Sequence, residues 1–168
     1  MATDEHRRQS RTRVTCGVVT VSDTRTEATD KSGHLICQFL ENDGHTVNAY
    51  AIVKDEPDLI RDHLRKLAAD AVCEVVLLSG GTGLAPRDTT FEAVEGLLEK
   101  RLTGFGELFR SLSYAEIGPA AMLSRATAGV FGNLLVFSMP GSVNAVRLAM
   151  EKLVLPEIGH AAALLRTT

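Results

Sequence analysis

Short runs of β-branched and other apolar residues alternate with segments of helical apolar spacing along most of this sequence. The strand-like runs occupy residues 14–21, 47–53 and 75–79. Between them, the segments around 35–40 and 57–68 carry apolar side chains at the spacing of one face of an α-helix. Because helices that connect parallel strands cover both faces of the sheet, this alternation predicts an α/β fold with a mostly parallel sheet.

The last third of the chain departs from this alternation. Gly132-Asn133 separates two short apolar runs, which is a β-hairpin signal and predicts a late antiparallel excursion in the sheet. Residues 104–121 are less regular and predict helical segments with a kink before Gly118. Pro156 is expected near the start of a final helix that ends near Leu165.

The bulk composition fits one globular domain. The chain has 168 residues, of which 45% are hydrophobic and 23% are charged, and this is enough to fill a single core. The formal net charge of -3 disfavours a broad nucleic-acid surface, and no apolar run approaches the length of a membrane span. We predict a flexible basic tail over residues 1–13 and a single folded domain over residues 14–168.

The cysteines and the N-terminus indicate a cytoplasmic protein. Cys16, Cys37 and Cys73 form no Cys-x-x-Cys pair and lie in apolar segments, as expected of small core residues in a reducing compartment. The N-terminus lacks the apolar core of a secretory signal, and the histidines show no metal-ligand spacing. A cytoplasmic enzyme or binding protein is the expectation.

A glycine-rich turn directly follows the strand-like run 75–79. Residues 79–83 read Ser-Gly-Gly-Thr-Gly, and Arg87 and Asp88 come soon after. Glycines let backbone N–H groups approach a ligand closely, and such nests favour anions. Arg87 can contact a phosphate and Asp88 can hold a metal ion, so the pattern predicts chemistry on a phosphorylated substrate.

Spacing excludes the two commonest phosphate motifs. A Walker A loop needs a lysine before Ser or Thr, but no lysine lies between Lys66 and Lys100. A dinucleotide fingerprint needs a third glycine where this chain has Pro86, and it follows the first strand rather than the third. The loop belongs to neither class.

Three other loops are predicted to gather beside the glycine-rich turn. They contain Ser22-Asp23, Asp55-Glu56 and residues 139–142, and each follows a predicted strand. Ligands of open α/β sheets bind at the carboxyl ends of the strands, so these loops predict one shared crevice. Residues 140–142 lie directly before a predicted helix, whose N-terminus can bind an anion.

Each polar residue of these loops also has a structural interpretation. Asp55 could cap the helix that follows it, Asp88 could brace its own turn, and Asp23 could be a turn residue. Ser142 is a good helix N-cap, which does not exclude a phosphate contact. Thr89 and Glu92 have the spacing of a capping box, with Thr89 as the N-cap. The predicted convergence of the loops favours a binding site.

These motifs resemble the molybdenum-cofactor biosynthesis family that includes MogA, MoaB and the gephyrin G domain. The resemblance runs in order from about Val14 to about Leu165, and residues 104–110 and 145–153 are most similar to the bacterial MoaB-type branch. The motifs that carry it are 21–24, 55–56, 79–83, 86–88, 92–93, 119–125 and 138–142. The resemblance implies a three-layer α/β/α sandwich, assembled as a homotrimer or homohexamer. At Thr89 and Phe91 this chain departs from many members, which have valine and proline there.

The resemblance also implies a function. It implies binding of molybdopterin and, in active members, its adenylylation by ATP with Mg²⁺; the alternative is a non-catalytic molybdopterin-binding or scaffold protein that works with other proteins of the pathway. Asp55 and Asp88 are the expected catalytic and metal-binding residues. The expected substrate-binding residues are Ser22, Asp23, Ser79, Gly80, Gly81, Thr82, Gly83, Arg87, Ser124, Arg125, Pro140, Gly141 and Ser142. No nucleic acid and no membrane is expected among the partners.

Overall fold

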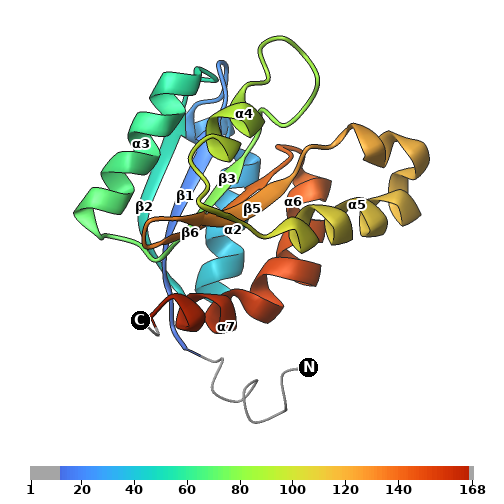
Figure 1. Cartoon of the computed structure of the whole chain (residues 1–168). Helices are drawn as coiled ribbons and strands as arrows, with labels where there is room; N and C mark the ends of the chain where they lie inside the picture. Colours follow the sequence, from blue (N-terminus) through green and yellow to red (C-terminus); the bar gives the residue numbers. More distant parts are fainter. Residues whose placement is uncertain (1–11, 167–168) are drawn as a thin grey trace.

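The computed structural model of the protein describes residues 12–166, in which helices lie on both sides of a six-stranded sheet (Figure 1). The predicted basic tail lies almost entirely outside the described residues. The strand order is β2-β1-β3-β6-β5-β4. The strands are β1 (Thr15–Val21), β2 (Thr46–Val53), β3 (Val75–Ser79), β4 (Lys100–Arg101), β5 (Thr127–Phe131) and β6 (Leu134–Met139).

The sheet is parallel in its first four positions and antiparallel at one edge. β1 pairs in parallel with β2 and β3, and β3 pairs in parallel with β6. β5 runs antiparallel to both β6 and β4. Gly132, at a φ of 58°, lies in the hairpin between β5 and β6. The predicted mostly parallel sheet with a late antiparallel excursion is therefore confirmed, although the two-residue strand β4 was not predicted.

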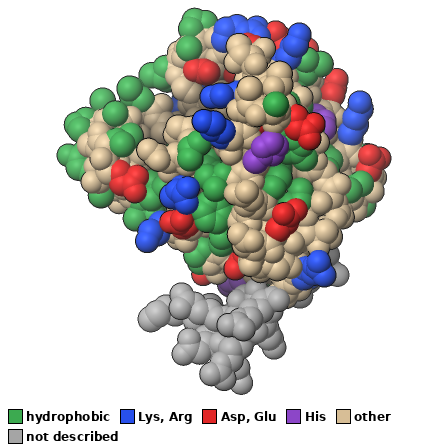
Figure 2. Space-filling view, turned by 180° about the vertical axis from the view of Figure 1, so that it is seen from behind, with side chains coloured by type: hydrophobic (Ala, Val, Ile, Leu, Met, Phe, Trp, Pro, Cys, Tyr) green, Lys and Arg blue, Asp and Glu red, His purple; other side chains and the backbone are tan. Residues whose placement is uncertain are grey.

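An arm of two helical segments extends from the antiparallel edge of the sheet (Figure 1). It consists of α5 (Thr103–Ile117) and the 3₁₀ segment η2 (Gly118–Leu123). Gly118 has a φ of 66° at their junction, which is the predicted kink. Hydrophobic side chains gather on this arm, at the left of Figure 2. In the described part of the chain, no helix has the length and apolar character needed to cross a membrane.

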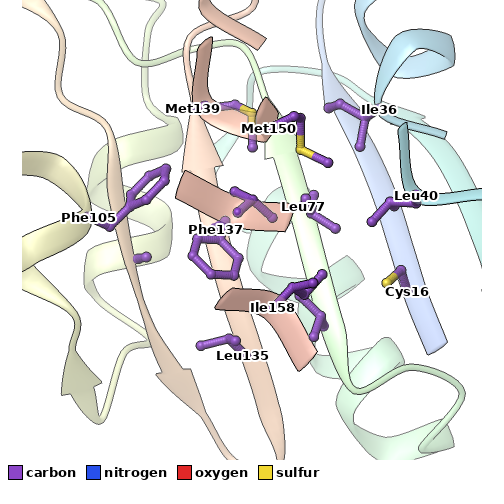
Figure 3. Close-up of a cluster of buried hydrophobic side chains, with 14 of the residues drawn as sticks. Cys16, Ile36, Leu40, Leu77, Phe105, Leu135, Phe137, Met139, Met150 and Ile158 are labelled. Atoms are coloured by element: carbon purple, nitrogen blue, oxygen red, sulfur yellow. The ribbon is translucent and has the colours of Figure 1, made fainter. Parts of the chain in front are cut away.

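One face of the sheet packs against α2 (Lys31–Asn42), α5 and the C-terminal helices (Figure 3). Phe105 of α5 meets Phe137 of β6 edge to face, with ring centroids 5.1 Å apart. Ile36 and Leu40 bring α2 onto the same cluster. Burial of an aliphatic or aromatic side chain of this size contributes about 1.5–3 kcal/mol, so this layer supplies much of the core.

The opposite face packs against α3 (Pro57–Asp70) and α4 (Thr90–Glu95). Ile60, Leu64 and Leu67 point inward from α3, as the helical spacing predicts. Adjacent residues of β3 contribute to the two different clusters, so this central strand is buried on both faces. The three-layer sandwich is confirmed.

The predicted final helix is present, with Pro156 as its second residue. α6 (Val143–Ala149) continues through a π-helical turn (Met150–Val154) into α7 (Leu155–Arg166) without a break. Pro156 has no backbone N–H to donate to the preceding turn, and its ring crowds that turn. The wider π turn ends two residues before this proline and accommodates it, so α7 begins at the predicted place without a break from α6.

The cysteines are free thiols inside the described fold. Cys16 and Cys73 are buried, and burial raises the pKa of the Cys16 thiol to about 12. Burial also raises the pKa of the half-buried Cys37, to about 11. Thiols with such pKa values carry almost no thiolate near neutral pH and behave as small apolar residues.

Candidate functional site

The four predicted loops meet at the carboxyl ends of the parallel strands. The Ser22 N–H donates to the Val53 carbonyl at 2.9 Å, which ties the loops after β1 and β2 together. The Gly80 N–H donates to the Met139 carbonyl at 3.0 Å, and a β-carbon on Gly141 would lie 3.1 Å from the Gly80 Cα. The predicted convergence of the loops is therefore present in the structure.

Two glycines of the turn have no room for a side chain. Gly80 has a φ of 105°, and a β-carbon there would lie 2.3 Å from the Val21 carbonyl oxygen. Gly81 has a φ of 65°, and its β-carbon would lie 2.0 Å from Thr90 Oγ1 and 2.5 Å from Asp55 Oδ2. Only glycine combines this backbone conformation with such close neighbours.

A cavity of about 180 Å³ opens between the ends of β1 and β3. The chain turns to opposite sides of the sheet after these two strands, so the cavity lies at a topological switch point, where such folds bind ligands. Its lining comprises Thr20, Val21, Ser22, Arg25, Asp30, Ser32, Ser79, Gly80 and Gly141. The hydroxyl of Ser79 is buried and has no hydrogen-bond partner among the described residues. A buried polar group without a partner is costly, which favours a bound ligand or water there.

Sequence reasoning missed four polar residues of this lining, Thr20, Arg25, Asp30 and Ser32, of which Asp30 is the only carboxylate. It is 2% exposed, and its Oδ2 accepts the hydroxyls of Thr20 and Tyr50, each at 2.6 Å. Its Oδ1 accepts the Gly33 N–H at 3.0 Å, so Asp30 is also the N-cap of α2. Burial and the neighbouring Asp30 carboxylate raise the pKa of Tyr50 well above its usual range.

The sequence does contain a signal for Asp30 and Ser32. Asp30-x-Ser32-Gly33 directly precedes the periodic apolar run of α2, which is typical of a capped helix start. Ser32 donates from Oγ to the Gly141 carbonyl at 2.7 Å and so links the start of α2 to the loop after β6. Arg25 lies only four residues after the end of β1, in the same loop as Ser22 and Asp23.

Asp55 lies on the other side of the glycine turn and is 6% exposed. Its Oδ1 accepts the Thr89 N–H at 3.0 Å and the Thr89 hydroxyl at 2.7 Å. Its own N–H donates to Asp23 Oδ1 at 3.1 Å. The residue at the N-cap of α3 is Glu56, which makes no side-chain cap bond. Asp55 therefore binds a distant helix start instead of capping the helix that follows it.

The predicted capping box at Thr89 is wrong. Thr89 does hold the N-cap position of α4, but its side chain makes no cap bond. Its hydroxyl is donated to Asp55, and the Glu92 side chain forms an ion pair with Arg125. Two long-range partners, invisible to a local pattern, outcompete the reciprocal bonds of the box.

Arg87 bridges two carboxylates on the neighbouring loops. It pairs with Asp23 Oδ2 at 2.8 Å and with Glu56 Oε1 at 2.7 Å. The hydrogen bonds from Arg87, together with the one from the Asp55 N–H, hold the pKa of Asp23 below its usual range. The guanidinium is exposed, so these pairs are open to solvent and to a competing anion.

Asp88 is partly buried and directly follows the exposed residues 84–87 of the glycine loop. Its Oδ2 accepts the Ala85 N–H at 3.2 Å, so the carboxylate does brace its own turn. A β-carbon on Gly83 would lie 2.6 Å from the same oxygen. Asp55 and Asp88 thus each lie against one glycine of the same loop.

Arg125 holds the glycine loop through hydrogen bonds to its backbone carbonyls. Its Nε donates to the Gly83 carbonyl at 3.1 Å, and its Nη2 donates to the Asp88 carbonyl at 3.1 Å. Its guanidinium lies 5.0 Å from the centroid of the Phe91 ring and pairs with Glu92. This pair lowers the pKa of Glu92. These contacts indicate that Arg125 stabilises the conformation of the loop.

The remaining predicted residues occupy more peripheral places. Ser124 and Arg125 line a second, more open hollow of about 400 Å³ beside Phe91, not the cavity at β1 and β3. Ser142 Oγ accepts the Ala145 N–H at 3.2 Å, so it is the N-cap of α6. Pro140 and Ser142 adjoin the cavity through Gly141, which is the residue of that loop in its lining.

A metal ion could be held only in part by protein atoms. Within residues 12–166, no three or more His, Cys, Asp or Glu side chains gather around one point that could hold a metal. Asp55 Oδ2 and Asp88 Oδ1 accept no hydrogen bond from the described residues, so each aspartate keeps one oxygen available. Mg²⁺ is commonly bound by one or two carboxylates together with substrate phosphates and water, and this pair of oxygens fits that mode.

Comparison with known proteins gives the family. Residues 17–160 match the family described as "Probable molybdopterin binding domain". The chain is 54% identical over 161 residues to molybdenum cofactor biosynthesis protein B of Bacillus anthracis, with 95% of each chain covered. It is 53% identical over 161 residues to the protein of the same name from Bacillus subtilis, with the same coverage.

Solved structures agree with these relatives. A crystal structure of molybdenum cofactor biosynthesis protein B has a TM-score of 0.91 and 52% identity, and the match covers 94% of this chain and 99% of that one. The tungsten cofactor synthesizing protein MoaB from Pyrococcus furiosus has a TM-score of 0.82 and 39% identity, with 92% and 98% covered. The chain therefore belongs to the molybdenum cofactor biosynthesis family of molybdopterin-binding domains, as its motifs predicted.

Proposed function

We propose that this protein binds molybdopterin and adenylylates it with ATP and Mg²⁺. The observation that carries the proposal is the arrangement around the glycine loop. A cavity with the unpartnered Ser79 hydroxyl lies on one side, and Asp55 and Asp88 lie on the other. The cavity offers a place for an uncharged or anionic ligand. The two aspartates offer a place for a metal-bound polyphosphate.

The reaction needs little acid–base chemistry. A phosphate oxygen of molybdopterin attacks the α-phosphorus of ATP, the bond from that phosphorus to the bridging oxygen breaks, and pyrophosphate leaves with its electrons. The attacking oxygen is already an anion, so no general base is required. The main barrier is repulsion between two polyanions, and positioning and electrostatics are the means to lower it.

The protein supplies both positioning and electrostatic stabilisation. The backbone of Gly80 to Gly83 and the hydroxyls of the cavity would bind and orient the substrates, and Arg25 in the cavity lining would add positive charge. Asp55 and Asp88 would hold Mg²⁺, which supplies charge neutralisation on the phosphates when it is bound. Arg87 is paired with Asp23 and Glu56, and an incoming phosphate would compete for the same guanidinium.

We also propose that the protein assembles as a homotrimer or homohexamer through the α5–η2 arm. Leu108, Tyr114, Ile117, Met122 and Leu123 are each at least half exposed there. Figure 2 shows hydrophobic side chains gathered on this part of the surface. Contiguous exposed apolar groups of this kind mark interaction surfaces. Light scattering after gel filtration tests the assembly, and a monomer at micromolar concentration would contradict it.

Incubation of the purified protein with molybdopterin, ATP and MgCl₂ tests the activity. We expect adenylylated molybdopterin and pyrophosphate in equal amounts, and neither product when Mg²⁺ is chelated. Pterin binding with no product would reject adenylylation and support the non-catalytic molybdopterin-binding protein. Absence of both binding and product would reject the two together.

A further inference from the structure

Thr89 makes two hydrogen bonds to one oxygen of Asp55. The backbone N–H donates to Oδ1 at 3.0 Å and the hydroxyl donates to the same oxygen at 2.7 Å. The two residues are 34 positions apart in the sequence, so the contact joins the loop after β2 to the start of α4. Hydrogen bonds to a carboxylate are stronger than those between neutral groups, and here both fall on Oδ1.

The contact determines where the other oxygen of Asp55 lies. With Oδ1 fixed by Thr89, Oδ2 faces Gly81, where a β-carbon would be only 2.5 Å away. Oδ2 accepts no hydrogen bond from any residue in the described range. The Asp55 backbone is fixed as well, because its N–H donates to Asp23. The carboxylate is therefore held at both ends, with one oxygen saturated and one available.

Thr89 gives up a local interaction to make this contact. A threonine at the N-cap of a helix usually accepts a backbone N–H of the first turn, but α4 has no side-chain cap bond. Departures from a local rule without local compensation are expected at functional sites. The compensation here is the oriented carboxylate of Asp55.

We propose that Thr89 is a positioning residue, whose hydroxyl orients Asp55 so that Oδ2 is directed to the Mg²⁺ of the bound nucleotide. This inference rests on the adenylylation proposed above. Without the hydroxyl, one hydrogen bond remains and the carboxylate gains freedom to rotate. Loss of a group that orients a metal ligand typically lowers metal affinity or activity about 10- to 100-fold.

Two substitutions separate this role from simple packing. Thr89→Val keeps the shape and removes the hydroxyl, whereas Thr89→Ser keeps the hydroxyl and removes a methyl group. We expect Thr89→Val to lower kcat about 10-fold or more, with the KM values for molybdopterin and ATP within about two-fold of the wild type. We expect Thr89→Ser to restore kcat to within about three-fold of the wild type.

A matched control comes from another threonine that donates to a carboxylate. Thr127 of β5 is buried, and its hydroxyl donates to Glu95 Oε1 of α4 at 2.5 Å. Thr127→Val should leave kcat unchanged, with any loss limited to stability. Thermal unfolding of all variants identifies those that fail to fold. If Thr89→Val does not fold, Thr89→Ser still tests the proposal, because the Thr89→Ser variant should bind and turn over normally.

Binding of Mn²⁺ in the presence of ATP, followed by electron paramagnetic resonance, gives a readout that does not need turnover. We expect weaker Mn²⁺ binding in Thr89→Val and recovery in Thr89→Ser. Equal Mn²⁺ affinity and equal kcat in the folded Thr89→Val variant would overturn the positioning role, as would an Asp55→Asn variant that binds Mn²⁺ as tightly as the wild type. A wild type that binds Mn²⁺ normally but forms no product would instead reject adenylylation alone.

Discussion

Asp55 and Asp88 lie against the same glycine loop, but the protein holds them in different ways. Asp55 is nearly buried and is fixed by Thr89 and Asp23, which come from other loops. Asp88 is only partly buried and accepts a hydrogen bond from Ala85, a residue of its own turn. Asp55 is thus part of a wall formed by several loops, whereas the Asp88 side chain is held only within its own loop.

The difference teaches how one site can be both ordered and accessible. A buried carboxylate with several partners is pre-organised, so it loses little freedom when a ligand arrives. An exposed loop opens at little cost and can close over a ligand, because few buried contacts oppose its motion. Arg125 limits that motion through its hydrogen bonds to the Gly83 and Asp88 carbonyls.

The largest effect is expected from Asp55→Asn. The substitution keeps the volume and removes the charge that the ordered wall presents, so turnover should fall by about 100-fold or more while molybdopterin binding changes little. Single-turnover adenylylation and pterin fluorescence measure the two quantities. Turnover at the wild-type rate in saturating Mg²⁺ would show that Asp55 has no role with the metal.

A smaller effect, on stability, is expected from Arg125→Ala. It removes the charged hydrogen bonds to the loop carbonyls and the stacking on Phe91, so the free energy of unfolding should fall by about 2 kcal/mol. Urea unfolding measures it, and proteolysis should become faster within residues 82–88. Arg110 is the control, since it reaches the Ser124 and Ala126 carbonyls only at 3.4 Å, and Arg110→Ala should cost less.

Asp88→Asn should lower turnover less than Asp55→Asn, by about ten-fold. The loop is exposed and can readjust, and the amide oxygen can still accept the Ala85 N–H or bind a cation weakly. The same single-turnover assay compares the two variants directly. A larger loss for Asp88→Asn than for Asp55→Asn would reverse the proposed division between wall and loop.

The smallest effect is expected from Arg87→Gln. Its ion pairs are exposed, so the midpoint of urea unfolding should not change measurably. The pKa of Asp23 should rise toward its ordinary value, because Arg87 holds it low in the wild type. A pH titration of the Asp23 carboxyl carbon by NMR measures this shift. An unchanged pKa would mean that the bond from the Asp55 N–H sets it instead.

Local patterns predicted the elements well where a residue's neighbours in the sequence are also its neighbours in space. The hairpin at Gly132, the kink at Gly118 and the Ser142 cap are all of this kind. The capping box at Thr89 is the counterexample. Its sequence is right for the box, but Asp55 offers a charged acceptor that no local pattern contains.

The cavity shows the same limit. Ser22, Ser79, Gly80 and Gly141 were expected at the site because each lies at or just after the carboxyl end of a strand. Asp30 was missed because its position depends on how α2 packs, which brings it under the hydroxyls of Thr20 and Tyr50. Helix starts beside a predicted crevice are therefore worth searching for buried carboxylates.

The sequence by itself determined the α/β class, the mostly parallel sheet and the edge at which the polar loops gather. These follow from hydrophobic periodicity and from glycines whose backbone conformations exclude side chains, and both properties are local. Only the tertiary structure decided that Asp55 is held by Thr89, that Arg125 braces the loop and that the two aspartates differ in burial. Such contacts join residues more than thirty positions apart, and their partners are chosen by packing of the finished sheet rather than by any neighbouring residue.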